Sequence, residues 1–484
     1  MDSTIVATSI PTIVRDLGGF SIFAWVFSAY VLAQAVTIPI YGKLADIYGR
    51  KPILTIGVLI FLGGSMLCGI SWSIGALIAF RAIQGIGAGA VMPIVFTVVG
   101  DLYTAQERGR IQGWLSTAWG AAAILGPAIG GFFSDYVSWR AIFYINIPLG
   151  LVALLMVTSS FHEQVERRRH QVDVAGSALL ALGAGLTIFG LLQAGVQWPW
   201  LSAPSFAVFG AAAVALVAFA WRESRAAEPT VPPWLVQSRV LMGATAASGI
   251  VGMLAIGLIT YLPTFAQRVL GLGATASGFL LTTVSVSWSL ASVISNRLYL
   301  TIGFRNNALV GGFLCLTAAI LFSALPESPP AWTLVLCCAV MGLGMGSIST
   351  PLIIGVQSAV DWQRRGVTTG AITFAQQIGQ AVGAALFTSV ANSTLQQWFA
   401  NAPPDLAGQL PSSLNEASRL LASEGREATG AVGRFIVEGL ALATHQVFIS
   451  LIFVAAVGLI VLLLTPIHFE VLVDDGNETG GRSS

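Results

Sequence analysis

The sequence predicts an all-α integral membrane protein, and three observations point to this fold class. Hydrophobic residues make up 55% of the 484-residue chain and charged residues only 9%, whereas soluble proteins carry about 25% charged residues. The apolar segments are as long as a membrane-spanning helix, which needs about 20 residues. They also lack the alternation of polar and apolar residues that the strands of a membrane β-barrel show.

The apolar segments predict fourteen transmembrane helices. They lie near residues 1–14, 21–41, 53–72, 76–100, 110–134, 141–161, 174–195, 204–221, 240–266, 275–299, 306–325, 332–356, 368–392 and 441–466. The first segment would cover only about 21 Å of a hydrocarbon core that is roughly 30 Å thick, so we expect a truncated first helix that begins before Met1. Polar residues at 393–440 predict a partly helical excursion outside the membrane, and residues 467–484 predict a disordered cytoplasmic tail.

The distribution of Lys and Arg predicts the orientation of the chain. Loops that follow even-numbered helices carry fifteen basic residues, and loops that follow odd-numbered helices carry six. Because basic loops stay in the cytoplasm, we expect a multi-pass protein of the cell (inner, cytoplasmic) membrane with both termini in the cytoplasm. The excursion at 393–440 is then extracytoplasmic. The formal net charge of +1 offers no basic surface for nucleic acid.

An internal repeat predicts two related halves. Residues 85–126 match residues 342–383 at a constant offset, with Gly85, Gly87 and Gly89 corresponding to Gly342, Gly344 and Gly346. Duplication of this kind is characteristic of transporters whose substrate site lies between the repeats. We expect an N-terminal six-helix half (1–165), an inserted helix pair 7–8 with flanking cytoplasmic loops (166–235) and a C-terminal six-helix half (236–466).

Two charged residues within the predicted helices are candidates for function. A central Arg costs at least about 2–3 kcal/mol in a membrane, so Arg81 either faces the bundle interior or reaches outward along the helix to the surface. Asp2 is the one acid clearly inside a predicted span. It either pairs with Arg81 and takes up protons, or caps the start of the truncated helix. Gln84, one turn from Arg81, is placed to share its hydrogen bonds.

The sequence contains no motif for nucleotide hydrolysis or enzyme catalysis. It has no G-x-x-x-x-G-K-[ST] phosphate loop and no H-E-x-x-H zinc motif. The four cysteines lie inside apolar segments, where packing explains them. We therefore expect no enzyme activity, no metal and no cofactor, and an ion gradient as the source of energy.

Five stretches resemble motifs of one family. They are GKLADIYGRK at 42–51, RAIQGIGAGAVMP at 81–93, GAAAILGPAIGG at 120–131, MDSTIVATSIP at 1–11 and SWRAIFYINIPLG at 138–150. Together they resemble the major facilitator superfamily, and within it the branch of fourteen-span drug:proton antiporters. The resemblance covers essentially the whole chain. It implies the major-facilitator fold, with two six-helix halves plus an inserted helix pair, in a multidrug efflux transporter.

The stretch 42–51 predicts a short cytoplasmic hairpin between the second and third helices. Gly42 and Gly49 allow a tight entry and exit, and Arg50 and Lys51 are expected to anchor at anionic headgroups. Asp46 could meet a helix N-terminus or a cation of the opposite half. The resemblance implies a cytoplasmic gate whose charge relay also contains Asp101, and a plain basic loop that sets topology is the alternative. In the second half, Leu300 takes the place of Asp46, which predicts an asymmetric gate.

The fifth helix carries a face of small residues with one break. Its members are Gly120, Gly126, Pro127, Gly130 and Gly131. Proline removes a backbone hydrogen bond and bends a helix, and glycines permit close approach of a neighbour. The resemblance implies an antiporter motif that seals the protein against leak. Generic small-residue packing is the alternative.

Polar and aromatic residues within the spans are weaker candidates for lining a substrate cavity. They are Trp25, Tyr30, Gln34, Trp119, Asn146, Tyr261, Gln376 and Gln380. Aromatic faces can contact a flat lipophilic cation. Gln376 and Gln380 are four residues apart and share one helix face. For each aromatic residue, packing is the alternative role.

These observations and the resemblance predict proton-coupled efflux, by antiport, of amphipathic or cationic drug-like compounds through alternating access. The expected partners are a small-molecule substrate, protons and the lipid bilayer, with no nucleic acid. The protein is expected to be a monomer, with a periplasmic adaptor in the case of a Gram-negative source. A dedicated exporter of one metabolite, such as a siderophore, amino acid or self-made antibiotic, is the first alternative. An importer and a non-transporting membrane sensor are the others.

Overall fold

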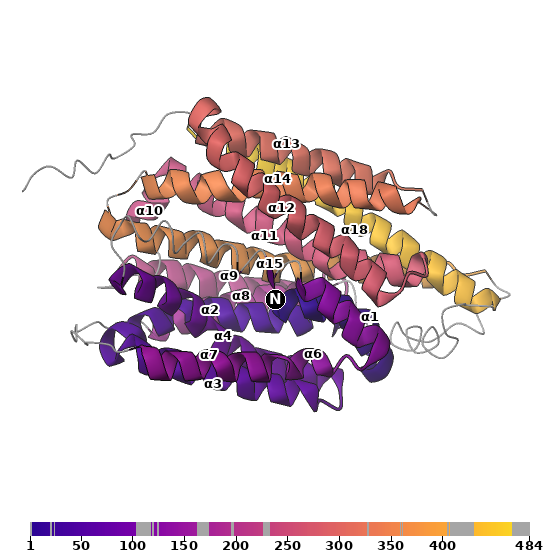
Figure 1. The fold of residues 1–484 in the computed structure, drawn as a ribbon. Helices are drawn as coiled ribbons and strands as arrows, with labels where there is room; N and C mark the ends of the chain where they lie inside the picture. The colour runs from indigo at the N-terminus through magenta and orange to yellow at the C-terminus, as the bar shows by residue number, and fades with distance from the viewer. Residues whose placement is uncertain are drawn as a thin grey trace, which may run out of the picture.

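The protein is built from helices that run nearly side by side (Figure 1). The computed structural model describes residues 2–19, 22–23, 25–102, 118, 121–122, 125–161, 174–194, 198–225, 233–326, 329–358, 360, 362–403, 406 and 430–466. Within these residues every named element is helical, and the β-structure is one isolated bridge between Ala194 and Trp198.

The N-terminal group of helices comprises α1 to α7, and the C-terminal group comprises α11 to α18. The first holds α1 (Asp2–Leu17), α2 (Trp25–Tyr48), α3 (Arg50–Gly69), α4 (Ile74–Leu102), α6 (Ala141–Tyr144) and α7 (Asn146–Ser160). In the sequence, the two groups are separated by α8 (Val174–Gln193), α9 (Ala203–Glu223) and α10 (Pro233–Gln237). The second holds α11 (Arg239–Thr264), the π-helix η2 (Phe265–Val269), α12 (Ala274–Ile302), α13 (Phe304–Ser323), α14 (Ala331–Ser358), α15 (Trp362–Ala400) and α18 (Ala431–Leu464).

Thirteen of the fourteen predicted spans coincide with these helices, and the fifth is described in part, as a helical segment at 125–136. Among the described residues, eleven segments are long and apolar enough to cross a membrane. At 39 residues, α15 is long enough, yet it is not one of them. It packs against α11, α2, α18 and α8, and none of residues 368–396 is exposed. A helix enclosed by other helices does not need the apolar surface that lipid demands.

The hairpin predicted at 42–51 is shorter than expected. Helix α2 continues through Gly42 to Tyr48, and α3 begins at Arg50, so Gly49 alone makes the turn. Its φ of 97° lies in the region that favours glycine. Gly303 makes the same one-residue turn between α12 and α13, with a φ of 83°. We call this side of the bundle the Gly49 end and the opposite side the Asp135 end.

The stretch predicted at 393–440 as a partly helical excursion is helical at both of its edges. Helix α15 continues to Ala400 and α18 begins at Ala431. The two added stretches pair with each other, because Trp398 stacks on Phe435 with ring centroids 5.0 Å apart and donates from Nε1 to the Phe435 carbonyl at 3.0 Å. The predicted tail at 467–484 lies outside the described residues.

The glycines of the sequence repeat make matching close contacts in the two groups. A Cβ added at Gly85 in α4 would collide with the Tyr30 carbonyl of α2, and one at Gly342 in α14 would collide with the Val284 carbonyl of α12. Gly89 and Gly346 lie one turn further along and meet the carbonyls of Gln34 and Trp288. Helix α4 thus lies on α2 as α14 lies on α12, which gives the sequence repeat a structural counterpart.

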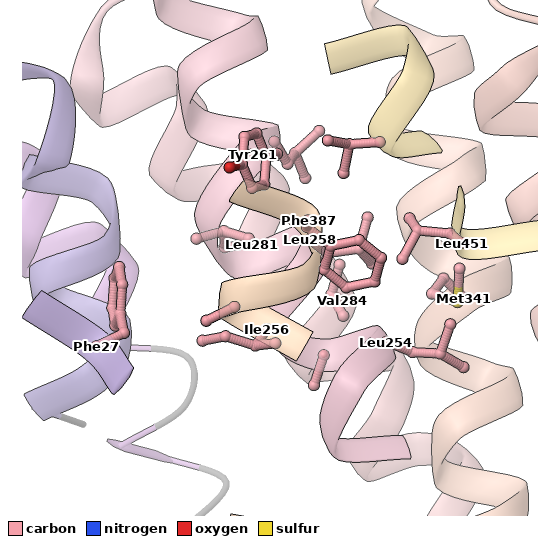
Figure 2. Close-up of a cluster of buried hydrophobic side chains, with 14 of the residues drawn as sticks. Phe27, Leu254, Ile256, Leu258, Tyr261, Leu281, Val284, Met341, Phe387 and Leu451 are labelled. Carbon is pink, nitrogen blue, oxygen red and sulfur yellow. The ribbon is translucent and has the colours of Figure 1, made fainter. Parts of the chain in front are cut away.

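The largest buried apolar cluster has most of its members in the C-terminal group and extends into the N-terminal group, as Phe27 of α2 shows (Figure 2). Leu254, Leu258, Met341, Phe387 and Leu451 bring α11, α14, α15 and α18 together there. Helix α8 packs against α9, and also against α2 and α15, so it contacts both groups. The predicted division into 1–165, 166–235 and 236–466 remains a proposal based on the repeat.

Candidate functional site

Arg81 lies in the third of α4 nearest the Asp135 end, and its side chain has no exposed surface. It therefore faces the interior and does not reach outward to the surface. Its Nη1 donates to Asp2 Oδ2 at 2.5 Å and to Gln84 Oε1 at 2.7 Å. Its Nε donates to the Val26 carbonyl of α2 at 3.2 Å. The guanidinium lies over the Tyr30 ring, 3.9 Å from the centroid, an arrangement that stabilises a desolvated cation.

Asp2, in the first turn of α1, accepts hydrogen bonds from three side chains. Arg81 occupies Oδ2, while Gln84 Nε2 and Asn146 Nδ2 both donate to Oδ1 at 3.0 Å. The Asp2 side chain is 11% exposed. All three partners are donors, so they stabilise the charged carboxylate. The structure thus brings together Asp2, Arg81 and Gln84, which the sequence put forward as a group.

Ser65 of α3 completes the cluster. Its hydroxyl accepts from Gln84 Nε2 at 3.2 Å and from Asn146 Nδ2 at 3.0 Å, and it donates to the Phe143 carbonyl at 2.9 Å. Sequence reasoning missed Ser65, because a lone hydroxyl in an apolar helix is common. Its importance comes only from its neighbours, because α4 and α7, which pack against α3, carry Gln84 and Asn146. Helices α1, α3, α4, α6 and α7 therefore meet at this polar cluster.

A second polar cluster joins the two groups of helices. Gln377 Nε2 of α15 donates to Gln34 Oε1 of α2 at 2.8 Å, and Gln380 Nε2 donates to Gln377 Oε1 at 3.0 Å. Nearby, the Ser28 hydroxyl donates to the Ala381 carbonyl at 3.4 Å. Gln34, Gln377 and Gln380 are uncharged, and we call them the glutamine cluster.

The two groups also meet at the Asp135 end. Asp135, at the end of segment 125–136, accepts from the backbone nitrogens of Ala274 and Thr275 at 3.2 and 2.8 Å, and from the Thr275 hydroxyl at 2.7 Å. It therefore caps the N-terminus of α12, where a negative charge is favourable. In addition, Arg268 of η2 donates to the Pro11 carbonyl at 2.9 Å, and Gln267 to the Thr8 carbonyl at 3.1 Å.

The predicted antiporter motif lies in this contact. Gly130 packs against Ile5 and Thr8 of α1, and Gly131 packs against Ala274 and Thr275 at the start of α12. Gly278 of α12 approaches the carbonyl of Pro127. Small residues thus permit segment 125–136 to fit closely between α1 and α12. Gly126 is buried, and Gly120 lies outside the described residues.

The predicted gate residues are described only in part. Lys51 Nζ donates to the Thr158 carbonyl near the end of α7 at 2.8 Å, and Arg50 is half-buried. Gly42 has no neighbour within 4 Å of an added Cβ. The side chains of Asp46, Asp101 and Leu300 lie outside the described part of the chain.

The remaining cavity candidates lie in different places. Trp25 packs at the edge of a small cluster around Tyr30 and Ile188. Tyr261 is 1% exposed, and its hydroxyl donates to Thr388 Oγ1 at 2.8 Å within the buried cluster of Figure 2. Gln376 is half-buried on α15, and Trp119 lies outside the described residues. Tyr30 and Asn146 belong to the Asp2–Arg81 cluster. Within the described residues, no group of three His, Cys, Asp or Glu side chains is placed to hold a metal ion.

Comparison with known proteins gives the family. Residues 1–384 match the sequence pattern of the Major Facilitator Superfamily. The chain belongs to this superfamily. Multidrug resistance protein 3 of Bacillus subtilis (strain 168) is 34% identical to this major facilitator chain over 391 residues, covering 81% of it and 76% of the relative. The multidrug transporter protein MdtP of the same organism is 32% identical over 393 residues, covering 81% and 73%.

Solved structures agree on the fold. A bacterial homologue of the human lysosomal transporter Spinster, in an inward-facing and unoccupied conformation, aligns with a TM-score of 0.66 at 16% identity, covering 96% of this chain and 95% of that one. At this identity, the likeness shows the fold alone. The prediction of an all-α membrane protein of the major facilitator superfamily is confirmed, and the chain is a multi-pass membrane transporter of that superfamily.

Proposed function

We propose that the chain is a proton-coupled exporter of amphipathic or cationic drug-like compounds, working by alternating access in the cytoplasmic membrane. The single observation that carries the proton coupling is the buried contact between Asp2 and Arg81. The names of the similar B. subtilis proteins support multidrug efflux. In this proposal the Gly49 end, with its basic residues, faces the cytoplasm.

The chemistry of the Asp2–Arg81 pair supports coupling between proton binding and helix movement. A proton on Asp2 removes the charge that Arg81 compensates, and it places a hydrogen on a carboxyl whose described neighbours are all donors. Each of those donors bonds more weakly to a neutral carboxyl than to a carboxylate, so these contacts loosen when the proton binds. A buried Arg without its partner is costly, so the loss favours a different packing of α1 on α4. Proton binding and release would thus alternate with two arrangements of the helices.

The contacts across the Asp135 end support a state that is closed on that side. Asp135, Gln267 and Arg268 each bridge the two groups of helices there. In the proposed orientation, this closed side is the extracytoplasmic one. Efflux requires that these contacts break, so that the central cavity opens outward after substrate has bound from the cytoplasm.

The experiment is reconstitution in liposomes that contain a pH-sensitive dye, with ethidium as the substrate. We expect ethidium flux to require an imposed proton gradient, and added ethidium to drive proton movement in the opposite direction. Asp2→Asn should uncouple the two fluxes. Asp16→Asn, on the exposed far end of the same helix, is the matched control and should leave the coupling intact. Wild-type flux that ignores the gradient, or intact coupling in Asp2→Asn, would refute the proposal.

The glutamine cluster favours a second candidate, a dedicated exporter of a neutral polar metabolite. Amide groups form hydrogen bonds with neutral polar substrates, whereas a dication would be better served by carboxylates. The two functions differ in how other compounds compete with the transported substrate. A multidrug exporter is inhibited by many unrelated lipophilic cations at similar concentrations. A dedicated exporter transports one compound and ignores those cations.

A further inference from the structure

The cluster around Asp2 assigns a role to Asn146 and Ser65 that neither the sequence nor the comparisons give them. We infer that Asn146, supported by Ser65, is a positioning residue that sets the pH at which Asp2 exchanges its proton and transmits that exchange to α7 and α3. The inference rests on the proposed proton coupling through Asp2.

The first step is the geometry at Oδ1 of Asp2. This oxygen accepts from Gln84 Nε2 and from Asn146 Nδ2, both at 3.0 Å. The remaining oxygen is held by Arg81. A hydrogen bond donated to a carboxylate favours its charged form. Asn146 therefore acts on the proton affinity of Asp2 through direct contact, although it lies 144 residues away in the chain.

The second step is the orientation of the Asn146 amide. The same Nδ2 donates to Ser65 Oγ at 3.0 Å, and Ser65 uses its own hydrogen on the Phe143 carbonyl at 2.9 Å. Ser65 can therefore only accept from the two amides, which directs the NH₂ groups of Gln84 and Asn146 toward Asp2. Ser65 is completely buried and Asn146 is 9% exposed, so little water is present to replace either bond.

The third step is that, among the residues that the structure describes, few other titratable groups lie around Asp2. They are Arg81 of α4, Tyr30 of α2 and Cys68 of α3, each close enough to Asp2 for an electrostatic interaction. Cys68 Sγ lies 3.7 Å from Gln84 Oε1, so it acts through Gln84. Helix α11, which packs on α1, brings Tyr261, but that hydroxyl is bonded to Thr388. From α7 the described contact is the Asn146 amide alone. When Asp2 takes up a proton, the bonds from its donors weaken, and Asn146 is the donor that joins α1 to α7.

The experiment measures the pH profile of ethidium transport in liposomes for the full chain and three variants. Asn146→Leu removes the donor and keeps the branched shape of the side chain, so the carboxylate loses support and the profile should move to higher pH by roughly one unit. Asn146→Asp places a second carboxylate beside Asp2 and should move it further in the same direction. Ser65→Ala frees both amides to turn and should cause a smaller shift of the same sign.

The matched control is Asn307→Leu. Asn307 in α13 is also completely buried, and within the described residues neither of its amide atoms has a hydrogen-bond partner. The same substitution there removes an asparagine without touching Asp2, so the pH profile should stay that of the wild type. Asn146→Asp is nearly isosteric with the native side chain, and it provides a folded variant if Asn146→Leu does not fold.

The outcomes separate this inference from the proposed function. If wild-type transport is proton-coupled and the Asn146 variants keep the wild-type pH profile, the inference is refuted while the proposed function stands. A raised KM for ethidium with an unshifted profile has the same meaning and makes Asn146 a substrate contact. In an Asp2→Asn background, Asn146→Leu should produce no further shift, and an additional shift there would also contradict the inference.

Discussion

Lys51 and Arg305 occupy corresponding positions directly after the two one-residue glycine turns. Lys51 donates to the Thr158 carbonyl in the last turn of α7, and Arg305 donates to the Leu462 and Leu463 carbonyls in the last turn of α18, the latter at 2.6 Å. The last carbonyls of a helix lack partners within it, and a cation there is favourable. Both halves therefore keep a basic side chain bound to the C-terminal end of a helix, although Asp46 of the first half is replaced by Leu300 in the second.

Removing these contacts should lower stability in both groups of helices. Lys51→Ala and Arg305→Ala each lose a cation at a helix C-terminus, which is worth about 0.3–1 kcal/mol near the surface. The two sites are far apart, so the double variant should show the sum. The midpoint of thermal unfolding in detergent measures the effect. Lys51→Arg and Arg305→Lys keep the charge and should stay close to wild type, and an unchanged midpoint in the double alanine variant would contradict the role.

The glycine contacts of the repeat predict a larger loss. Gly85→Ala forces a methyl group against the Tyr30 carbonyl, and Gly342→Ala forces one against the Val284 carbonyl. Overpacking of this kind costs about 1–3 kcal/mol. Gly63 in α3 has nothing within 4 Å of an added Cβ, so Gly63→Ala should be neutral or stabilising by up to about 1 kcal/mol, as for alanine in a helix. Equal unfolding midpoints for Gly85→Ala and Gly63→Ala would show that α4 does not need the close approach.

The sequence predicted most of the fold, because lipid imposes a simple rule on helix length and polarity. It located the ends of α15 and α18 poorly, since Trp398 and Phe435 extend both helices through a contact between segments far apart in the chain. Hydropathy placed a span at 368–392 but not the central position of α15, because that position depends on its packing against α11, α2, α18 and α8. The glycine turns were placed correctly at Gly49 but not at Gly42, whose helical conformation depends on its neighbours in α2.

The candidate site was predictable where charge was involved. Arg81 and Asp2 stand out in apolar segments, and they proved to be in contact. Asn146 and Tyr30 were expected to line the cavity, because the sequence shows that they are polar but not which way their side chains point. Both lie against the Asp2–Arg81 pair. Ser65 gave no signal of its own. Its importance arises from two amides on other helices that meet at its hydroxyl.

The glutamine cluster should show energetic coupling between α2 and α15. Gln377→Leu leaves Gln34 Oε1 without its donor, and Gln34→Leu leaves Gln377 Nε2 without its acceptor. Each single change should therefore cost more than half of the double change, with a coupling of about 0.5–3 kcal/mol in unfolding measurements. Gln376 has no bond to Gln34 among the described contacts, so the pair Gln34→Leu and Gln376→Leu should be additive. Equal coupling in both pairs would rule out a specific Gln34–Gln377 interaction.

Asp135 should hold the Asp135 end closed, because its carboxylate makes three hydrogen bonds across the two groups of helices. Asp135→Ala leaves the first turn of α12 without its cap, and a bond to a charged group is worth about 1.5–3 kcal/mol, enough for a tenfold change in population. Ser277 is completely buried beside this contact. In Ser277→Cys, labelling by a membrane-impermeant maleimide should therefore become about tenfold faster when Asp135→Ala is added. Glu438→Ala, an exposed acid of α18 at the same end, should leave the rate unchanged. A rate that stays low in Asp135→Ala would mean that Arg268 and the glycine packing of segment 125–136 keep this end closed without the cap.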